Sequence, residues 1–191
     1  MAIIRKYSLF GISALPFRMV FLMWLLYTIG YQENLDFSFL SVKPRTLAGF
    51  PAIITAPLVH ANLWHLVSNS VPLLFLGTCL FFFYESVGNQ IFWRCYLIPY
   101  ALVWLLGPRV AYHMGASGVI YGLAFFLIAF GLLKRDIASV LLSLVVLCLY
   151  GGMLFTGLLP GWPGVSWETH LAGGLTGLLS AIQLHINENK N

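Results

Sequence analysis

The chain has 191 residues, of which 60% are hydrophobic and only 8% are charged, whereas about 25% of the residues of a typical soluble domain are charged. This composition excludes a soluble globular protein and indicates an integral membrane protein with one domain. The net charge of +4 comes from scattered residues, so it gives no sign of nucleic-acid binding and is better explained by orientation in a membrane.

Six apolar segments are candidates for membrane spans, each of which takes about 20 residues in a helix. We therefore predict an all-α bundle of six transmembrane helices, forming a single domain over residues 1–191 with its core at about 15–186. The first segment is expected to be retained, because Arg18 interrupts it and no signal-peptide cleavage site follows. The predicted spans cover residues 15–31, 63–84, 91–106, 117–133, 137–159 and 169–186.

The basic residues predict how this bundle is oriented. With six spans, seven basic residues fall on one side of the membrane and three on the other, so we expect both termini in the cytoplasm. The larger group is Arg5, Lys6, Arg18, Arg94, Lys134, Arg135 and Lys190, and the smaller is Lys43, Arg45 and Arg109.

Polar side chains in the spans are candidate functional residues, because placing them in a bilayer is costly. His65 and Asn69 lie near the start of the second span, with His60 just before it, while Ser117 opens the fourth span and His170 opens the sixth. Even-numbered spans run in the same direction, so we expect all five residues at one face of the membrane. The charge distribution makes this the outer face.

Two glycine stripes predict which helices meet, since Gly-x-x-x-Gly lets two helix backbones approach closely. One stripe follows Ser117 and the other follows His170. If the stripes meet, the serine hydroxyl and the imidazole lie at similar depth on adjacent helices, within reach of a hydrogen bond. The stripes are Gly118 with Gly122, and Gly173 with Gly177.

This arrangement would suit nucleophilic catalysis. A serine hydroxyl attacks a carbonyl only when a base removes its proton, and His170 can be that base. At a helix N-terminus, Ser117 has unpaired backbone N–H groups and the positive end of the helix dipole beside it, and both favour an oxyanion. His65 and Asn69 share one helix face and can supply further donors.

Neighbouring residues would support this pair. Gly115 and Gly118 leave room for a substrate backbone, and Tyr121, one turn after Ser117, can pack on the His170 ring. Glu168 is two residues from His170, a spacing that directs it elsewhere, so we predict a serine–histidine dyad rather than a triad. We expect no metal and no cofactor, since the cysteines lack metal-ligand spacing.

Three motifs together resemble those of the rhomboid intramembrane serine proteases: "HANLWHLVSN" (60–69), "GASGVIYG" (115–122) and "HLAGGLTG" (170–177). The resemblance implies that Ser117 is the nucleophile and His170 the general base, and that the Ser117 N–H, the His65 ring and the Asn69 amide form an oxyanion site. Tyr121 matches the residue that stacks on the catalytic histidine. His60 matches a structural histidine near the first loop.

The same resemblance implies the biological setting. The substrates would be other membrane proteins, cut in or near a transmembrane segment within the lipid bilayer, and the short chain suggests a bacterial inner membrane. Many rhomboids carry a Trp-Arg pair in the first loop where this chain reads "GFPAIITAP", which leaves the packing of that loop open. His113 has only a structural interpretation as a loop residue.

Simpler explanations exist for each residue alone: a serine at a helix start is commonly an N-cap, and a histidine is commonly a satisfied polar residue. Two other functions are therefore kept open. One is a catalytically silent rhomboid-like protein that binds membrane helices, although such relatives usually lose the serine or the histidine. The other is a small transporter or metal permease with His60, His65 and His170 as ligands, which predicts acidic or further histidine partners deep in the spans.

Overall fold

The part of the chain that the structure describes, residues 14–108, 111–161 and 164–190 of a computed structural model, is built from helices. Its long helices contain 18 to 22 residues each, enough to cross a bilayer. They are α2 (Ala14–Gln32), α4 (Leu63–Phe83), α5 (Glu85–Leu106), α6 (Ser117–Lys134), α7 (Ile137–Gly157) and α8 (Trp167–Glu188). The connection from α2 to α4 holds the short helices η1 (Ser38–Leu40), α3 (Ala52–Thr55) and η2 (Ala56–Leu58).

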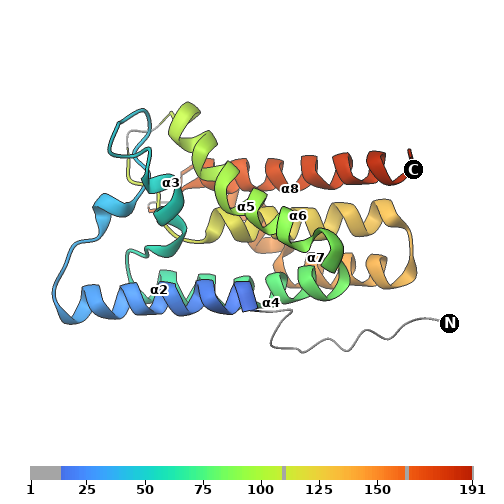
Figure 1. The fold of residues 1–191 in the computed structure, drawn as a ribbon, viewed down its shortest axis with the longest axis horizontal. Helices are drawn as coiled ribbons and strands as arrows, with labels where there is room; N and C mark the ends of the chain where they lie inside the picture. The colour runs from blue at the N-terminus through green and yellow to red at the C-terminus, as the bar shows by residue number, and fades with distance from the viewer. Residues whose placement is uncertain (1–13, 109–110, 162–163, 191) are drawn as a thin grey trace.

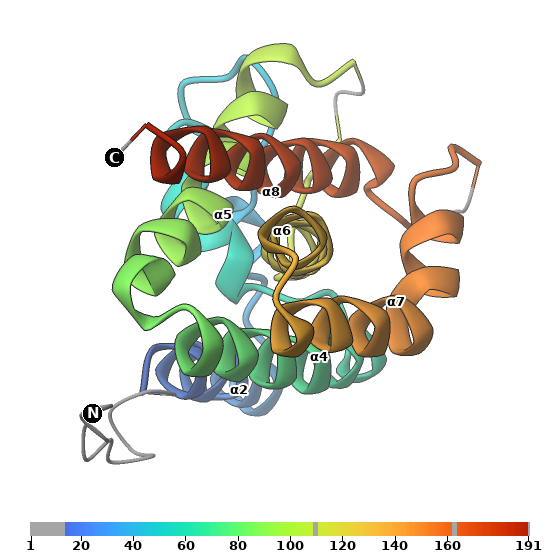
Figure 2. The same cartoon turned by 90° about the vertical axis from the view of Figure 1, so that its right-hand side faces the viewer.

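Helix α6 is the centre of the bundle. Figure 2 shows it end-on, with α8, α5, α4 and α7 around it and α2 on the outer side of α4. Its sequence is apolar on every side, which is the pattern of a helix enclosed by others. Large side chains on opposite sides of it, such as Ile120, Phe126 and Phe130, are fully buried. Helix α6 is therefore held from several directions.

The two glycine stripes meet, which confirms the predicted pairing of these helices. A methyl group on Gly173 would overlap the carbonyl oxygen of Gly118, and one on Gly177 would overlap the carbonyl oxygen of Gly122. The backbones of α6 and α8 thus touch with no side chain between them. This contact fixes the depth of the start of α8 relative to the start of α6.

The directions of the helices gather the candidate polar residues. Figure 1 shows that α4, α6 and α8 begin at the end of the molecule that carries the α2–α4 connection, while the C-terminus lies at the opposite end. His65, Ser117 and His170 all lie in the first turn or two of these three helices. They therefore share one end of the bundle, as the alternation of spans predicted.

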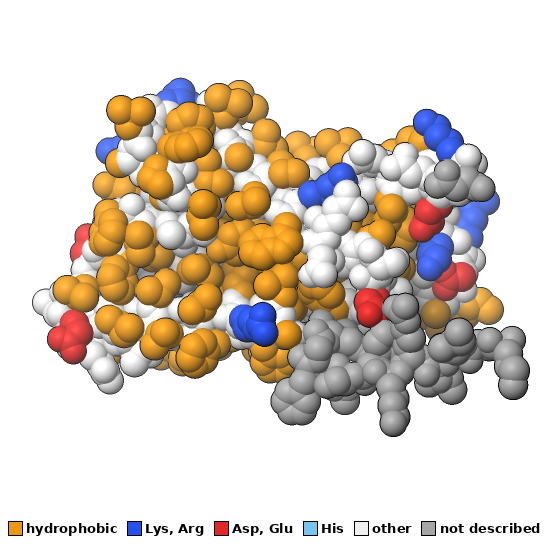
Figure 3. All heavy atoms as spheres, in the orientation of Figure 1, with side chains coloured by type: hydrophobic (Ala, Val, Ile, Leu, Met, Phe, Trp, Pro, Cys, Tyr) orange, Lys and Arg blue, Asp and Glu red, His pale blue; other side chains and the backbone are white. Residues whose placement is uncertain are grey.

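The surface is that of an integral membrane protein. In Figure 3 hydrophobic side chains cover most of the visible face, and acidic side chains lie toward the two ends of the long axis. Among the described residues, α2, α4, α6 and α7 have both the length and the apolarity of membrane spans. Helices α5 and α8 are equally long but more polar, so the count of six spans remains a prediction.

Arg94 lies farther inside a helix than the predicted span implied. Helix α5 begins at Glu85, six residues before the predicted span, because the polar stretch "ESVGNQ" is helical without being apolar. Arg94 consequently lies in the middle of α5, where its guanidinium donates to the side-chain oxygen of Gln183 on α8 at 2.9 Å. The predicted span, 91–106, had placed Arg94 near its first residue, on the side with more basic residues. Arg5, Lys6 and Arg109 lie outside the described residues.

The first loop, whose packing the sequence left open, is held mainly by α5. Side chains of α5 bind backbone carbonyls of the loop, and one arginine of the loop binds the end of α5. The bonds are Trp104 Nε1 to the Thr46 carbonyl at 2.9 Å, Tyr96 hydroxyl to the Ile54 carbonyl at 2.7 Å, and Arg45 to the Gly107 carbonyl at 2.6 Å. A buried loop backbone is stable only when such partners are supplied.

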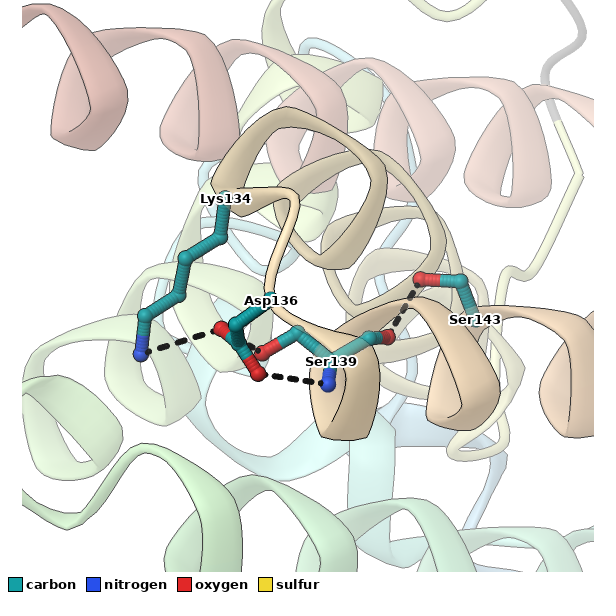
Figure 4. A network of polar contacts seen from close by, with 4 residues as sticks. All are labelled: Lys134, Asp136, Ser139 and Ser143. Atoms are coloured by element: carbon teal, nitrogen blue, oxygen red, sulfur yellow. Dashed lines mark hydrogen bonds and ion pairs between the residues drawn. The ribbon is translucent and has the colours of Figure 1, made fainter.

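A short turn at the far end of the molecule joins α6 to α7 (Figure 4). Arg135 ends α6 in a left-handed conformation with φ of 60°. Asp136 then caps α7 by accepting hydrogen bonds from the Ser139 backbone N–H at 2.9 Å and hydroxyl at 2.7 Å, and these bonds lower the pKa of the Asp136 carboxyl. Ser143 donates to the Ser139 carbonyl at 3.0 Å, and Lys134 lies 3.8 Å from the Asp136 carboxylate.

Candidate functional site

Ser117 is the first residue of α6, and the segment before it is held in an unusual conformation. Gly115 has φ of 97°, which favours glycine. Its N–H donates to the Ala56 carbonyl at 2.9 Å, and its carbonyl accepts a hydrogen bond from the buried Tyr100 hydroxyl. The N-cap residue of α6, Ala116, makes no side-chain capping bond, but the buried Tyr100 hydroxyl interacts with the backbone N–H groups of Gly118 and Val119. The backbone N–H of Ser117, which binds no side chain among the described residues, keeps its capacity to bind a negative charge.

His65 and Asn69 of α4 lie against this segment. The position of a Cβ on Gly115 would be 2.5 Å from ring atoms of His65 and 3.6 Å from Nδ2 of Asn69. The Asn69 amide, which is 4% exposed, donates to the His65 backbone carbonyl at 2.8 Å. That bond orients the amide and leaves its second N–H available. Two side-chain donors thus converge beside the backbone that precedes Ser117.

His60 also binds the backbone that precedes Ser117. Its Nδ1 donates to the Leu58 carbonyl at 3.3 Å, and its Nε2 accepts from the backbone N–H of Ala116 at 3.4 Å. This pattern requires the neutral ring. Burial, together with the His65 ring 5.0 Å away, lowers the pKa of His60 from 6.5 to about 3. His60 therefore acts in this structure as a neutral bridge between the loop and the residue before Ser117.

His170 lies in the first turn of α8 with its ring fixed on two sides. The Tyr121 and His170 rings stack with their centroids 4.1 Å apart and their planes 6° apart. The Nδ1 atom of His170 lies 2.8 Å from the Gly157 carbonyl at the end of α7. A carbonyl can only accept, so Nδ1 carries a hydrogen, and in the neutral ring Nε2 then has the lone pair. The Tyr121 hydroxyl donates in turn to the Met153 carbonyl at 2.7 Å.

Ser117 and His170 lie on facing turns of α6 and α8. Gly118 follows Ser117, and a Cβ on it would be 2.7 Å from the methyl group of Thr169, the residue before His170. No hydrogen bond joins the Ser117 hydroxyl to the His170 ring within the described part of the chain. Catalytic hydrogen bonds are often long before substrate binds and tighten in the complex.

The sequence did not identify some of the residues that help to build the site. Tyr100 could have been noticed as a phenol in an apolar segment, since such polar groups need partners. Gly157 acts through its backbone carbonyl, which gives no sequence signal. His113 was interpreted only as a loop residue, and it is 1% exposed with Nδ1 placed 2.6 Å from the Ser166 hydroxyl.

The described residues do not assemble a ligand set for a metal ion. Among residues 14–108, 111–161 and 164–190, no three side chains of His, Cys, Asp or Glu come together as a metal site requires. The structure therefore adds no support to a permease that binds metal through His60, His65 and His170.

Comparison with known proteins identifies the family. The Rhomboid domain matches residues 48–187 of this chain. Uncharacterized proteins of Mycobacterium bovis and Mycobacterium tuberculosis are each 35% identical over 185 residues, an alignment that covers 87% of this chain and 73% of the relative. Rhomboid-like protein 11, chloroplastic, of Arabidopsis thaliana is 38% identical over 81 residues, covering 39% of this chain and 28% of that protein. Because the domain match spans well over half of the sequence, this chain belongs to the rhomboid family.

Proposed function

We propose that this protein is an intramembrane serine endopeptidase in which Ser117 is the nucleophile and His170 the general base. One observation carries the proposal. His170 is bonded through Nδ1 to a backbone carbonyl and stacked on Tyr121, one turn from Ser117. In the neutral ring the nitrogen with a lone pair is then Nε2, and the ring cannot turn freely. A neutral imidazole held in one tautomer beside a serine is what proton abstraction requires.

The reaction proceeds in two stages. The Ser117 hydroxyl oxygen attacks the carbonyl carbon of the scissile peptide bond while its proton passes to Nε2 of His170. The tetrahedral intermediate collapses when the imidazolium returns that proton to the leaving amine, which gives an acyl-enzyme and a free amine. Water then attacks the ester with His170 again as base, and release of the carboxylic acid restores Ser117.

The negative oxygen of the intermediate needs donors that are already in place. The Ser117 backbone N–H, the His65 ring and the second N–H of the Asn69 amide are proposed for this role. Their support is the convergence of His65 and Asn69 on Gly115 and the position of Ser117 as the first residue of α6. The carbonyl of Gly157 replaces the carboxylate of a triad by holding Nδ1, so a dyad suffices.

The proposed substrates are transmembrane segments of other membrane proteins. An intact helix shields its carbonyls, so the segment must unwind near the cut, and we expect Gly, Pro or other helix-weakening residues there. The proposal places the whole chain as one six-span domain in the plasma membrane of a bacterium, with both termini in the cytoplasm. The site then lies near the outer face, where water can reach it.

Labelling with a serine-directed fluorophosphonate tests the dyad. We expect the purified protein in detergent micelles to be labelled, and Ser117→Ala and His170→Ala each to abolish labelling. Ser180→Ala is the matched control, because this buried serine lies on α8 ten residues after His170 and away from the site. Labelling that survives in both Ser117→Ala and His170→Ala would overturn the proposed chemistry.

Cleavage of single-span proteins by the purified protein in liposomes tests the substrate class. We expect cleavage of a substrate with a Gly or Pro in its span and a strong reduction when that residue is replaced by Leu. Cleavage that is unchanged by this replacement would contradict the unwinding step. Binding of the substrate with no cleavage, together with no fluorophosphonate labelling, would favour the catalytically silent alternative.

A further inference from the structure

His113 connects three segments that meet beside the site. Its backbone N–H donates to the Val42 carbonyl at 2.8 Å, and its carbonyl accepts from the Val42 N–H at 3.0 Å. This pair ties the first loop to the segment that leads into Ser117. The side chain of His113 points the other way, to the start of α8, where Nδ1 lies 2.6 Å from the Ser166 hydroxyl oxygen.

Ser166 passes this contact to the turn that carries His170. Its hydroxyl lies 2.5 Å from the hydroxyl of Thr169. Its backbone carbonyl accepts from the N–H groups of Thr169 at 3.0 Å and His170 at 3.2 Å. The methyl group of Thr169 faces Gly118. A shift of Ser166 would therefore move His170, one member of the dyad, directly, and it would move Gly118, the residue after Ser117, through Thr169.

The start of α8 lacks the side-chain capping hydrogen bond that commonly fixes the start of a helix. Ser166 is the N-cap residue of α8, yet its side chain makes no capping hydrogen bond, although a serine at this position normally caps a backbone N–H. The hydroxyl is used for His113 and Thr169 instead. The connection before it contains Gly161 and Gly164 with φ of 119° and 76°, so the chain that enters α8 includes residues with wide conformational freedom.

We infer that His113 is a positioning residue that, through the Ser166 and Thr169 hydroxyls, sets the first turn of α8 so that His170 faces Ser117. The inference adds to the proposed function, on which its activity readout rests, and it assigns no contact between His113 and the substrate. This role also connects the first loop to the base His170, because the backbone of His113 pairs with Val42.

Variants of His113 can separate the effect of losing the Nδ1 hydrogen bond from the effect of losing the volume of the ring. In His113→Asn the amide occupies the position of Nδ1, whereas in His113→Gln it occupies the position of Nε2. We expect His113→Gln, His113→Ala and Ser166→Ala to lower the rate of fluorophosphonate labelling, by on the order of 10²-fold for a displacement near 1 Å. His113→Asn should keep the rate within a few-fold of the parent.

The double variant His113→Ala with Ser166→Ala should lose no more than either single variant, because both changes break the same connection. Loss in His113→Asn equal to that in His113→Ala would overturn the inference, since bulk rather than the Nδ1 bond would then matter. An unaffected Ser166→Ala would overturn it as well. Labelling of Ser166 itself is checked by mapping the modified peptide, and modification there in place of Ser117 would also count against it.

A second measurement keeps this inference separate from the proposed function. Histidine-selective ¹⁵N spectra of the protein in micelles report the ring nitrogens of His170 without any reaction. We expect the His170 signals to shift in His113→Gln and Ser166→Ala and to stay in place in His113→Asn. If the parent is not labelled by fluorophosphonate, the proposed protease fails, and the spectra alone decide the role of His113. Unchanged His170 signals in His113→Gln would overturn that role.

Discussion

Both the backbone conformation of Gly115 and its contact with His65 require glycine, so a substitution at this position should affect the site. At φ of 97° any other residue is strained by about 1–3 kcal/mol, and a Cβ there would press on the His65 ring from 2.5 Å. We expect Gly115→Ala to displace His65 and to lower the rate of fluorophosphonate labelling by on the order of 10²-fold. The measurement is the labelling rate in micelles at fixed protein concentration.

Gly161→Ala is the matched control for this change. Gly161 has φ of 119°, so alanine is strained there too, but no atom of the described residues lies within 4 Å of its Cβ position. We expect labelling close to that of the parent. Similar labelling rates for Gly115→Ala and the parent would mean that the contact with His65 is unimportant.

His60 predicts how stability depends on pH. Its pKa is lowered to about 3 by burial, from an ordinary value of 6.5, so the unfolded chain takes up a proton that the folded chain refuses. Above pH 6.5 this difference does not reduce the free energy of unfolding, but the free energy of unfolding declines as the pH falls from 6.5 toward 3. At pH 5 the loss is about 2 kcal/mol. We expect the unfolding temperature in micelles to fall between pH 7.5 and pH 5.

His60→Gln tests the source of that fall, because glutamine does not titrate and its side-chain oxygen can accept from the Ala116 N–H. We expect a smaller drop in unfolding temperature over the same pH range. His185→Gln serves as the control, since this partly exposed residue lies near the C-terminus, and its drop should match that of the parent. An equal drop in His60→Gln would assign the pH dependence to other groups.

At the scale of helices, the contact between α6 and α8 should be the least tolerant of added volume. A methyl group on Gly177 would overlap the Gly122 carbonyl, and backbone cannot move aside as a side chain can. We expect Gly177→Ala to force the helices apart and to destabilise the protein by about 1–3 kcal/mol or more. The unfolding temperature in micelles measures this effect.

Gly152→Ala on α7 is the comparison for Gly177→Ala, because nothing in the part of the chain that the structure describes lies within 4 Å of the Cβ position of Gly152. Alanine also favours a helix more than glycine does, so the unfolding temperature should be unchanged or higher. Two variants with the same unfolding temperature would contradict close packing between α6 and α8.

The helices themselves were largely predictable. Helices α4, α6 and α7 begin at the residues where the apolar segments begin, at Leu63, Ser117 and Ile137, because the same property that favours burial in a bilayer defines the segment. Helix α5 differs, since hydropathy detects how apolar a segment is and not how far a helix extends into polar sequence. Its first six residues were therefore missed.

For the whole molecule, the gathering of polar residues at one end followed from alternating helix directions, and the α6–α8 contact followed from the glycine stripes. What did not follow is the set of contacts made by backbone carbonyls and loop hydroxyls. The bond from His170 to the Gly157 carbonyl joins two helices through an atom that every residue possesses. The contact between His113 and Ser166 joins loops 53 residues apart. Neither has a pattern in the sequence, because both depend on tertiary packing.

The basic residues at one end of the molecule predict its orientation in the membrane. Lys134, Arg135 and Lys190 lie at the end opposite the Ser117 site, as Figure 1 shows for the α6–α7 turn and the C-terminus, so we expect that end in the cytoplasm. In a bacterial host, alkaline phosphatase fused after Gly161 should be active and a fusion after Lys190 inactive, because α8 crosses the membrane between them. A fusion after Arg135 is the control and should be inactive. Equal activity at Gly161 and Lys190 would show that the more polar α8 does not cross, and would contradict the six-span arrangement.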